Sequence, residues 1–170
     1  MRHFAFPTLL ALGVAVCFSG PVFGQEAERN EIGGFTGLLH SEEANEFVVG
    51  GDYTRVAARH LAIDAQLDYS RKSDAGFTTN SYLLSAGPQY LIPTHSKIKP
   101  YVGAGAGVLH ESTGAEGWGA ASVDKFAVEV GGGIRVDATK RWGLNPEFKV
   151  IKAMDFPVFE RATFGVFYRF

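Results

Sequence analysis

The sequence has few of the residues that would supply disulfides, a metal site or a nucleic-acid surface. Cys17 is its only cysteine, so no internal disulfide can form and the fold must depend on backbone hydrogen bonds and packing. Its five histidines occur in no His-x-His or His-Glu-x-x-His spacing, so we expect no metal site and no cofactor. The 16 Lys and Arg residues nearly balance the 18 Asp and Glu residues and form no basic stripe, which argues against nucleic acid as a partner.

An apolar run long enough for a transmembrane helix is also missing. The apolar stretch at residues 4–18 is shorter than the roughly 20 residues that such a helix needs. It follows the positive start Arg2-His3 and is followed by Pro21-Val22-Phe23-Gly24, which is the pattern of a secretory signal peptide. We therefore predict a signal peptide at residues 1–24, cleaved after Gly24, and a single domain at residues 25–170.

Glycine and aromatic residues are abundant, with 21 Gly, 14 Phe and an aromatic content of 13%. This composition suits an all-β fold, and eight segments alternate between two faces with the period of two that marks β-strands. Each is about as long as the 9–11 residues with which a tilted strand crosses a bilayer. In the first segment Gly33, Gly34 and Gly37 obscure the alternation, so its two faces stay unassigned. The segments are Asn30–His40, Phe47–Val56, Leu61–Ser70, Ser81–Ile92, Tyr101–Glu111, Phe126–Asp137, Trp142–Val150 and Glu160–Phe170.

The connections and the aromatic residues indicate a membrane barrel. Arg71–Asn80 and Ser112–Lys125 are predicted to be long polar loops at one end, whereas most connections at the other end are short. Aromatic residues of the apolar face gather near both strand ends, as in the two interfacial girdles of such barrels. The sequence therefore predicts an eight-stranded antiparallel up-and-down transmembrane β-barrel with its apolar face toward lipid; the alternative is a soluble, lipocalin-like barrel. The expected girdles are Tyr90, Trp142, Tyr168 and Phe170 on the turn side, and Phe47, Tyr69, Tyr82 and Phe126 on the loop side.

The last strand and two internal motifs carry a resemblance to a known family. The closing strand places Phe164, Val166, Tyr168 and Phe170 on one face and ends on an aromatic residue, like the closing strands of bacterial outer-membrane barrels. P-Y-V-G-A-G-A-G at Pro100–Gly107 and G-G-G-I-R-V-D-A-T-K-R-W-G-L-N-P-E-F at Gly131–Phe148 resemble the fifth to seventh strands of the small OmpA-like outer-membrane β-barrels.

This resemblance implies a location in the outer membrane of a Gram-negative envelope. It implies contact with outer-membrane lipid and lipopolysaccharide, and with the barrel-assembly machinery and periplasmic chaperones. That machinery would read the four apolar residues of the closing strand as an assembly signal. We expect a monomer, and, because nothing follows Phe170, we expect the peptidoglycan-binding domain of OmpA itself to be absent.

The polar face of the strands predicts a charged lumen. Pairing Val136 opposite Trp142 would place Glu129 opposite Lys149, and buried charges persist only when they are paired. We therefore predict an ion network that plugs an interior already narrow in an eight-stranded barrel. Pro88 and Pro146 each remove a ladder hydrogen bond, so they are expected to mark bulges or errors in the strand limits. The predicted network consists of Asp64, Asp68, Glu129, Arg135, Glu147, Lys149, Arg161 and Arg169.

The function expected from these features is a structural or surface-interaction role without enzymatic activity. One alternative is a lipid A acyl hydrolase, because His110, Ser112 and Asp124 share a parity at the lipid-facing rim and resemble the His/Ser/acid set of lipid A deacylases. That family places its His and Ser late in the chain, whereas two further strands follow here. A second alternative, a narrow ion pore, requires gaps in the packing of the lumen.

Overall fold

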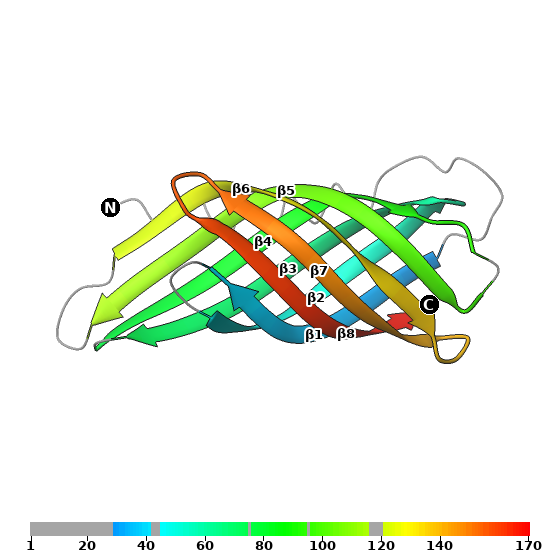
Figure 1. Cartoon of the computed structure of the whole chain (residues 1–170), viewed down its shortest axis with the longest axis horizontal. Helices are drawn as coiled ribbons and strands as arrows, with labels where there is room; N and C mark the ends of the chain where they lie inside the picture. The colour runs from blue at the N-terminus through cyan, green and yellow to red at the C-terminus, as the bar shows by residue number, and fades with distance from the viewer. Residues whose placement is uncertain (1–28, 42–44, 75, 95, 116–120) are drawn as a thin grey trace.

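The computed structural model describes residues 29–41, 45–74, 76–94, 96–115 and 121–170. They form eight antiparallel strands, each paired with its neighbours in sequence, and the first pairs with the last to close a barrel (Figure 1). The predicted signal peptide and Gly24 lie outside the described residues. The strands are β1 (Arg29–His40), β2 (Asn45–Ala58), β3 (Leu61–Asp74), β4 (Phe77–Leu91), β5 (Ile98–Ala115), β6 (Ala121–Asp137), β7 (Trp142–Ala153) and β8 (Val158–Arg169).

The closure joins the first and last strands along their whole length. The β1–β8 ladder runs from Glu31 opposite Arg169 to His40 opposite Glu160. At the turn end of this ladder, the amide of Phe170 donates to the carbonyl of Asn30 at 3.0 Å, so the start of β1 and the end of the chain lie side by side. Closing the sheet removes its edges, as a β-structure in lipid requires, because hydrocarbon cannot hydrogen-bond an unpaired backbone.

The two faces of the sheet have the polarity expected in lipid. Apolar side chains such as Phe47 and Val130 face outward with exposed fractions of 63% and 59%, whereas charged ones such as Arg161 and Lys149 are buried inside at 0% and 6%. A water-soluble protein has the reverse arrangement. The structure also assigns the faces of β1, where Glu31 is buried in the lumen and Ile32 faces outward. The predicted fold class is therefore confirmed, and the described residues contain no helix able to span a membrane.

The two long polar loops predicted at one end are wrong, because most of their residues continue the strands. β3 extends to Asp74 and β4 begins at Phe77, while β5 and β6 have 18 and 17 residues against 12 in each of β1, β7 and β8. Hydroxyl groups pair across these extensions, for example Thr79 with Thr113 at 2.9 Å. Both faces of the extensions are mostly polar, with Phe77 and Val123 as isolated apolar residues, so the sequence carried no regular apolar alternation there.

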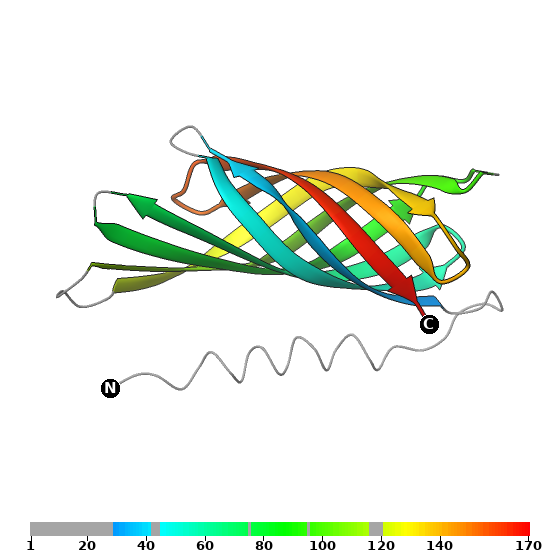
Figure 2. The same ribbon diagram turned by 90° about the horizontal axis from the view of Figure 1, so that it is seen from below.

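These extensions form a small sheet that continues past the closed part of the barrel (Figure 2). Residues 71–74 of β3 pair only with β4, because the β2–β3 ladder ends at Val48 opposite Ser70. Residues 121–125 of β6 pair only with β5, because the β6–β7 ladder begins at Ala127 opposite Ala153 and the carbonyl of Phe126 already accepts from the amide of Met154. We call this four-stranded extension of β3–β6 the outer sheet; unlike the barrel below it, it has two free edges, with which no strand of the described residues pairs.

The two prolines lie inside strands without forming bulges. Pro88 stands opposite Ile63 and Pro146 opposite Phe164, each in unshifted register with one neighbouring strand. On the other side of each proline the backbone pairing is interrupted but resumes in the same register. The expected bulges are therefore wrong, since each missing N–H costs only local pairing on one side. A register shift does occur between Val56 and Ala58.

Candidate functional site in the barrel lumen

Arg161 on β8 occupies the middle of the lumen and connects three strands. Its Nη1 donates to the carboxylate of Asp68 on β3, and its Nη2 donates to Glu147 on β7 at 2.7 Å. The same Nη2 donates to the side-chain oxygen of Gln66 at 2.9 Å, and the guanidinium carbon lies 5.5 Å from the ring centre of Phe35. This cation is fully buried, and these acceptors replace part of the water it has lost, while its Nε has no hydrogen-bond partner among the described residues.

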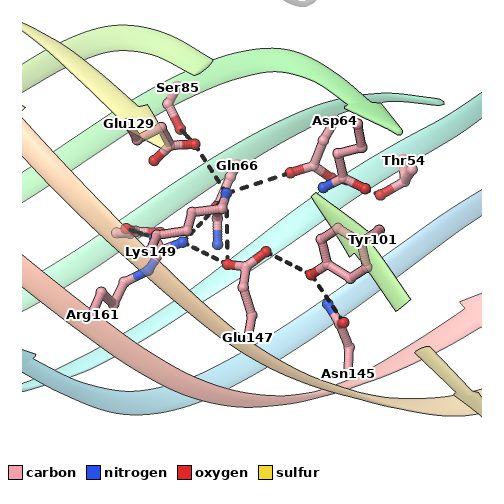
Figure 3. A network of polar contacts seen from close by, with 12 residues as sticks. Thr54, Asp64, Gln66, Ser85, Tyr101, Glu129, Asn145, Glu147, Lys149 and Arg161 are labelled. Carbon is pink, nitrogen blue, oxygen red and sulfur yellow. Dashed lines mark hydrogen bonds and ion pairs between the residues drawn. The ribbon is translucent and has the colours of Figure 1, made fainter. Parts of the chain in front are cut away.

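Lys149 on β7 forms a second centre beside Arg161 (Figure 3). Its Nζ donates to Gln66 at 2.6 Å and to Glu129 on β6 at 2.9 Å. Two further carboxylates, those of Glu147 and Asp64, lie 3.6 and 3.9 Å from the same nitrogen. Gln66 therefore accepts from both luminal cations and ties the two centres into one network.

Small residues on the inner face of β5 leave space for this network. A Cβ atom at Gly105 would lie 2.9 Å from Oε1 of Glu129, so a side chain there would displace the carboxylate that pairs with Lys149. The glycines of β5 thus serve close packing within a narrow barrel. No group of three or more His, Cys, Asp and Glu side chains in the described residues is arranged to hold a metal ion.

A third centre closes the lumen toward the turn end. Arg135 on β6 donates to Glu31 at 2.8 Å and to Gln89 at 2.7 Å. Arg169 on β8 donates to the other oxygen of Glu31 at 2.8 Å and to Asp137 at 3.0 Å. One buried carboxylate, Glu31 on β1, therefore joins two arginines from β6 and β8, the strands on either side of β7.

The structure brings the residues of the predicted network together. Each of the eight has an ion-pair partner within 4.0 Å inside the lumen. The reasoning from sequence missed Glu31 and Gln66. Gln66 shares the parity of Asp64 and Asp68 and could have been found on that basis, whereas the glycines of β1 hid the face of Glu31.

The predicted register between β6 and β7 is wrong by two residues. Val136 stands opposite Leu144, and Lys149 stands opposite Gly131. The turn is wider than expected, because the amides of Ala138 and Thr139 both donate to the carbonyl of Trp142, at 3.1 and 2.9 Å. A shift of two residues keeps every side chain on its face, so the charged residues still point into the lumen.

Comparison with known proteins agrees with this architecture. The family model described as outer membrane protein beta-barrel domain matches residues 9–170. The chain belongs to this family of outer-membrane β-barrels. It is accordingly a protein of the Gram-negative outer membrane, and the apolar outer face of its barrel suits contact with lipid. A comparison with curated proteins finds no match.

Solved structures of other outer-membrane barrels share the fold of this family member. Neisserial surface protein A has a TM-score of 0.71 at 16% identity, with 87% of this chain and 100% of that chain covered. Ail, the attachment invasion locus protein of Yersinia pestis, gives 0.62 at 15% identity, covering 85% and 100%, in a complex with the heparin analogue sucrose octasulfate. The N-terminal barrel domain of Pseudomonas aeruginosa OprF gives 0.59 at 18% identity, covering 84% and 97%. At these identities the likeness concerns the fold alone.

The rim of this outer-membrane barrel brings together two of the three residues of the hydrolase alternative. Nδ1 of His110 lies 2.6 Å from Oδ1 of Asp124 on the adjacent strand. Ser112 stands opposite Ser122 in the ladder, and in the described residues its hydroxyl makes no hydrogen bond to His110. A serine nucleophile needs such a base within hydrogen-bond reach, so the geometry does not favour the hydrolase.

The closing strand of this family member lies on the barrel surface as its pattern predicts. Phe164, Val166 and Phe170 are exposed at 53%, 44% and 63%, and the ring of Tyr168 packs 4.9 Å from that of Trp142 in the turn-side girdle. Recognition of this strand by the assembly machinery stays a prediction.

Proposed function

We propose that this outer-membrane barrel has a closed, non-conducting lumen and holds its outer sheet outside the membrane as a binding surface for a protein partner. The observation that carries the proposal is the pair of outer-sheet edges that are free among the described residues, at residues 71–74 of β3 and 121–125 of β6. Non-conducting behaviour is part of this proposal, because paired charges fill the lumen. The absence of enzymatic activity is also part of it, because the rim geometry does not favour the hydrolase.

The packing of the lumen supports the non-conducting part of the proposal. Arg161, Lys149 and Arg135 each bind partners on more than one strand, so the charged side chains reach across the interior rather than lining a channel. Above them, Leu83, Leu109 and Ile151 form an apolar cluster with partly buried Leu39 and Phe159. Opening a water path would require breaking several buried ion pairs, which is costly.

The free edge of β6 supports the binding part. The carbonyl of Phe126 accepts from the amide of Met154, on the β7 side, so the backbone groups of Asp124 and Ser122 point to the same side in an antiparallel ladder. No strand in the described part of the chain pairs with them there. An extended peptide could add to this edge by backbone hydrogen bonds, as in other cases of strand addition.

The β5–β6 extension is long enough to lift this edge away from lipid. A tilted strand needs about 9–11 residues to cross the bilayer. β5 has 18 residues and β6 has 17, so several residues of each remain beyond the apolar band. The side chains of Ser122 and Asp124 are exposed there, which leaves the edge open to a partner from outside the cell.

A proline substitution tests this proposal without breaking the barrel. Ser122→Pro removes an N–H that points to the open side, and proline is tolerated at such edge positions. Peptides selected from a random phage-displayed library against the wild-type barrel in nanodiscs would be measured against Ser122→Pro and Ser122→Ala. We expect Ser122→Pro to weaken them about tenfold or more and Ser122→Ala, which keeps the N–H, to bind like wild type. Equal binding to all three proteins would contradict strand addition.

A further inference from the structure

The turn end of the barrel, which faces the periplasm in this family, opens into a cavity of about 610 Å³. We call it the turn-end vestibule. Arg29, Arg59, Lys99, Arg135 and Arg169 contribute to its walls, together with Glu31. Its volume falls in the range of small-molecule sites, about 300–1,000 Å³.

The charges of this vestibule do not balance. Five cations line it, and two carboxylates contact them: Glu31 pairs with Arg135 and Arg169, and Asp137 pairs with Lys99 and Arg169. Among the side chains of the described residues, five positive charges against two negative ones leave an excess of three. A concave site with low-dielectric walls concentrates such a field and attracts ions of opposite sign.

Two of the five cations are unpartnered in the described part of the chain. The side chains of Arg29 and Arg59 have neither an ion pair nor a hydrogen bond there. They come from different strand ends, Arg29 from the start of β1 and Arg59 from the turn after β2. Deeper in the vestibule, Arg135 is only 4% exposed and is held by Glu31. The free guanidinium groups thus stand where an anion entering the vestibule would meet them.

We propose that the turn-end vestibule binds a phosphate-bearing anion through Arg29 and Arg59. The planar guanidinium donates two parallel hydrogen bonds to phosphate oxygens, which makes arginine the preferred residue for such groups. Such a phosphate could belong to a soluble periplasmic compound or to the headgroup of an inner-leaflet phospholipid at the barrel rim. This site lies at the opposite end from the outer sheet, so its test is independent of the proposed surface function.

The primary experiment uses inorganic pyrophosphate as the probe and the refolded barrel in maltoside micelles, whose detergent carries no phosphate. Isothermal titration calorimetry should detect saturable binding to the wild type. Arg29→Gln/Arg59→Gln should weaken it by about tenfold or more, because two charge-assisted contacts are lost. The matched control, Lys97→Gln/Lys140→Gln, removes the same charge from exposed turn residues at the same end, outside the vestibule walls, and should change the affinity by less than about threefold.

Two further measurements distinguish a soluble phosphate compound from a phospholipid headgroup as the ligand, and control for a misfolded variant. In nanodiscs containing phosphatidylglycerol, pyrophosphate affinity should fall relative to micelles if lipid headgroups occupy the site, and should stay unchanged if they do not; both results support the proposal. In the wild type, pyrophosphate should shift the amide NMR signals of Arg59 and His60 but not those of residues 138–141. Absence of saturable binding, equal losses in the two double variants, or shifts spread over both turns would overturn the proposal.

Discussion

Nζ of Lys149 lies 2.9 Å from Oε1 of Glu129, although the two residues are not opposite each other in the β6–β7 ladder. Lys149 stands opposite Gly131, two residues from Glu129, so the ion pair runs diagonally across the inner face. Both side chains are buried, at 6% and 8% exposed. Because neither can be hydrated separately, we expect their contributions to stability to be coupled.

A double-mutant cycle on this pair measures that coupling. Lys149→Ala should lower the free energy of unfolding by about 3–5 kcal/mol, since it leaves Glu129 buried without its cation. Adding Glu129→Ala should cost less than simple addition predicts. The measurement is urea unfolding of the barrel in lipid vesicles. Lys152→Ala, on the outer face of the same strand, is the control and should change stability by no more than about 0.5 kcal/mol. Additive energies would indicate a lumen wet enough to hydrate each charge.

Arg161→Ala should open the lumen to ions. The guanidinium fills the centre of the barrel and holds Asp68 and Glu147, which would be left facing a water-filled gap lined with negative charge. Planar-bilayer recordings should give no steady conductance for the wild type and a small cation-selective conductance for the variant. Arg141→Ala, in the exposed β6–β7 turn, should behave like the wild type. A wild-type conductance as large as that of Arg161→Ala would instead support the narrow-pore alternative.

Deletion of Phe170 tests the predicted assembly signal. Phe170 is 63% exposed at the turn end and stacks with its neighbour Tyr168 at a ring distance of 6.4 Å. We expect the shortened protein to be exported but to yield little heat-modifiable barrel in outer-membrane fractions. Phe47→Ala removes an equally exposed aromatic from the loop-side girdle and should assemble normally. Normal amounts of barrel from the deletion would refute the role of Phe170.

His110→Ala and Ser112→Ala should leave lipid A unchanged. The His110–Asp124 contact exists, but among the described residues the Ser112 hydroxyl makes no hydrogen bond to His110 that would activate it as a nucleophile. Mass spectra of lipid A from cells expressing the wild type, either variant or no barrel should be the same. Loss of an acyl-chain cleavage in either variant would make the hydrolase the leading function.

The alternating pattern of the strands, together with the aromatic residues near the strand ends, predicted the barrel and its inward charges. A period of two fixes which side chains share a face. Because the aromatic residues near the strand ends favour lipid on the apolar side, charges such as Arg161 and Lys149 on the other face are expected to point inward. Even the error in the β6–β7 register left the Glu129–Lys149 contact intact, because a slip of two residues does not exchange the faces.

Tertiary structure decided the features that depend on where the chain meets itself. The outer sheet was mistaken for loops, because Thr79 and Thr113 pair through polar faces that carry no apolar period. Pairing of β1 with β2 brings Arg29 and Arg59 to the same end, and closure of the barrel through β1 and β8 adds Arg169 to the vestibule. Local periodicity determines the face of a residue, whereas its partners depend on strand register and on closure of the sheet, which involve contacts distant in sequence.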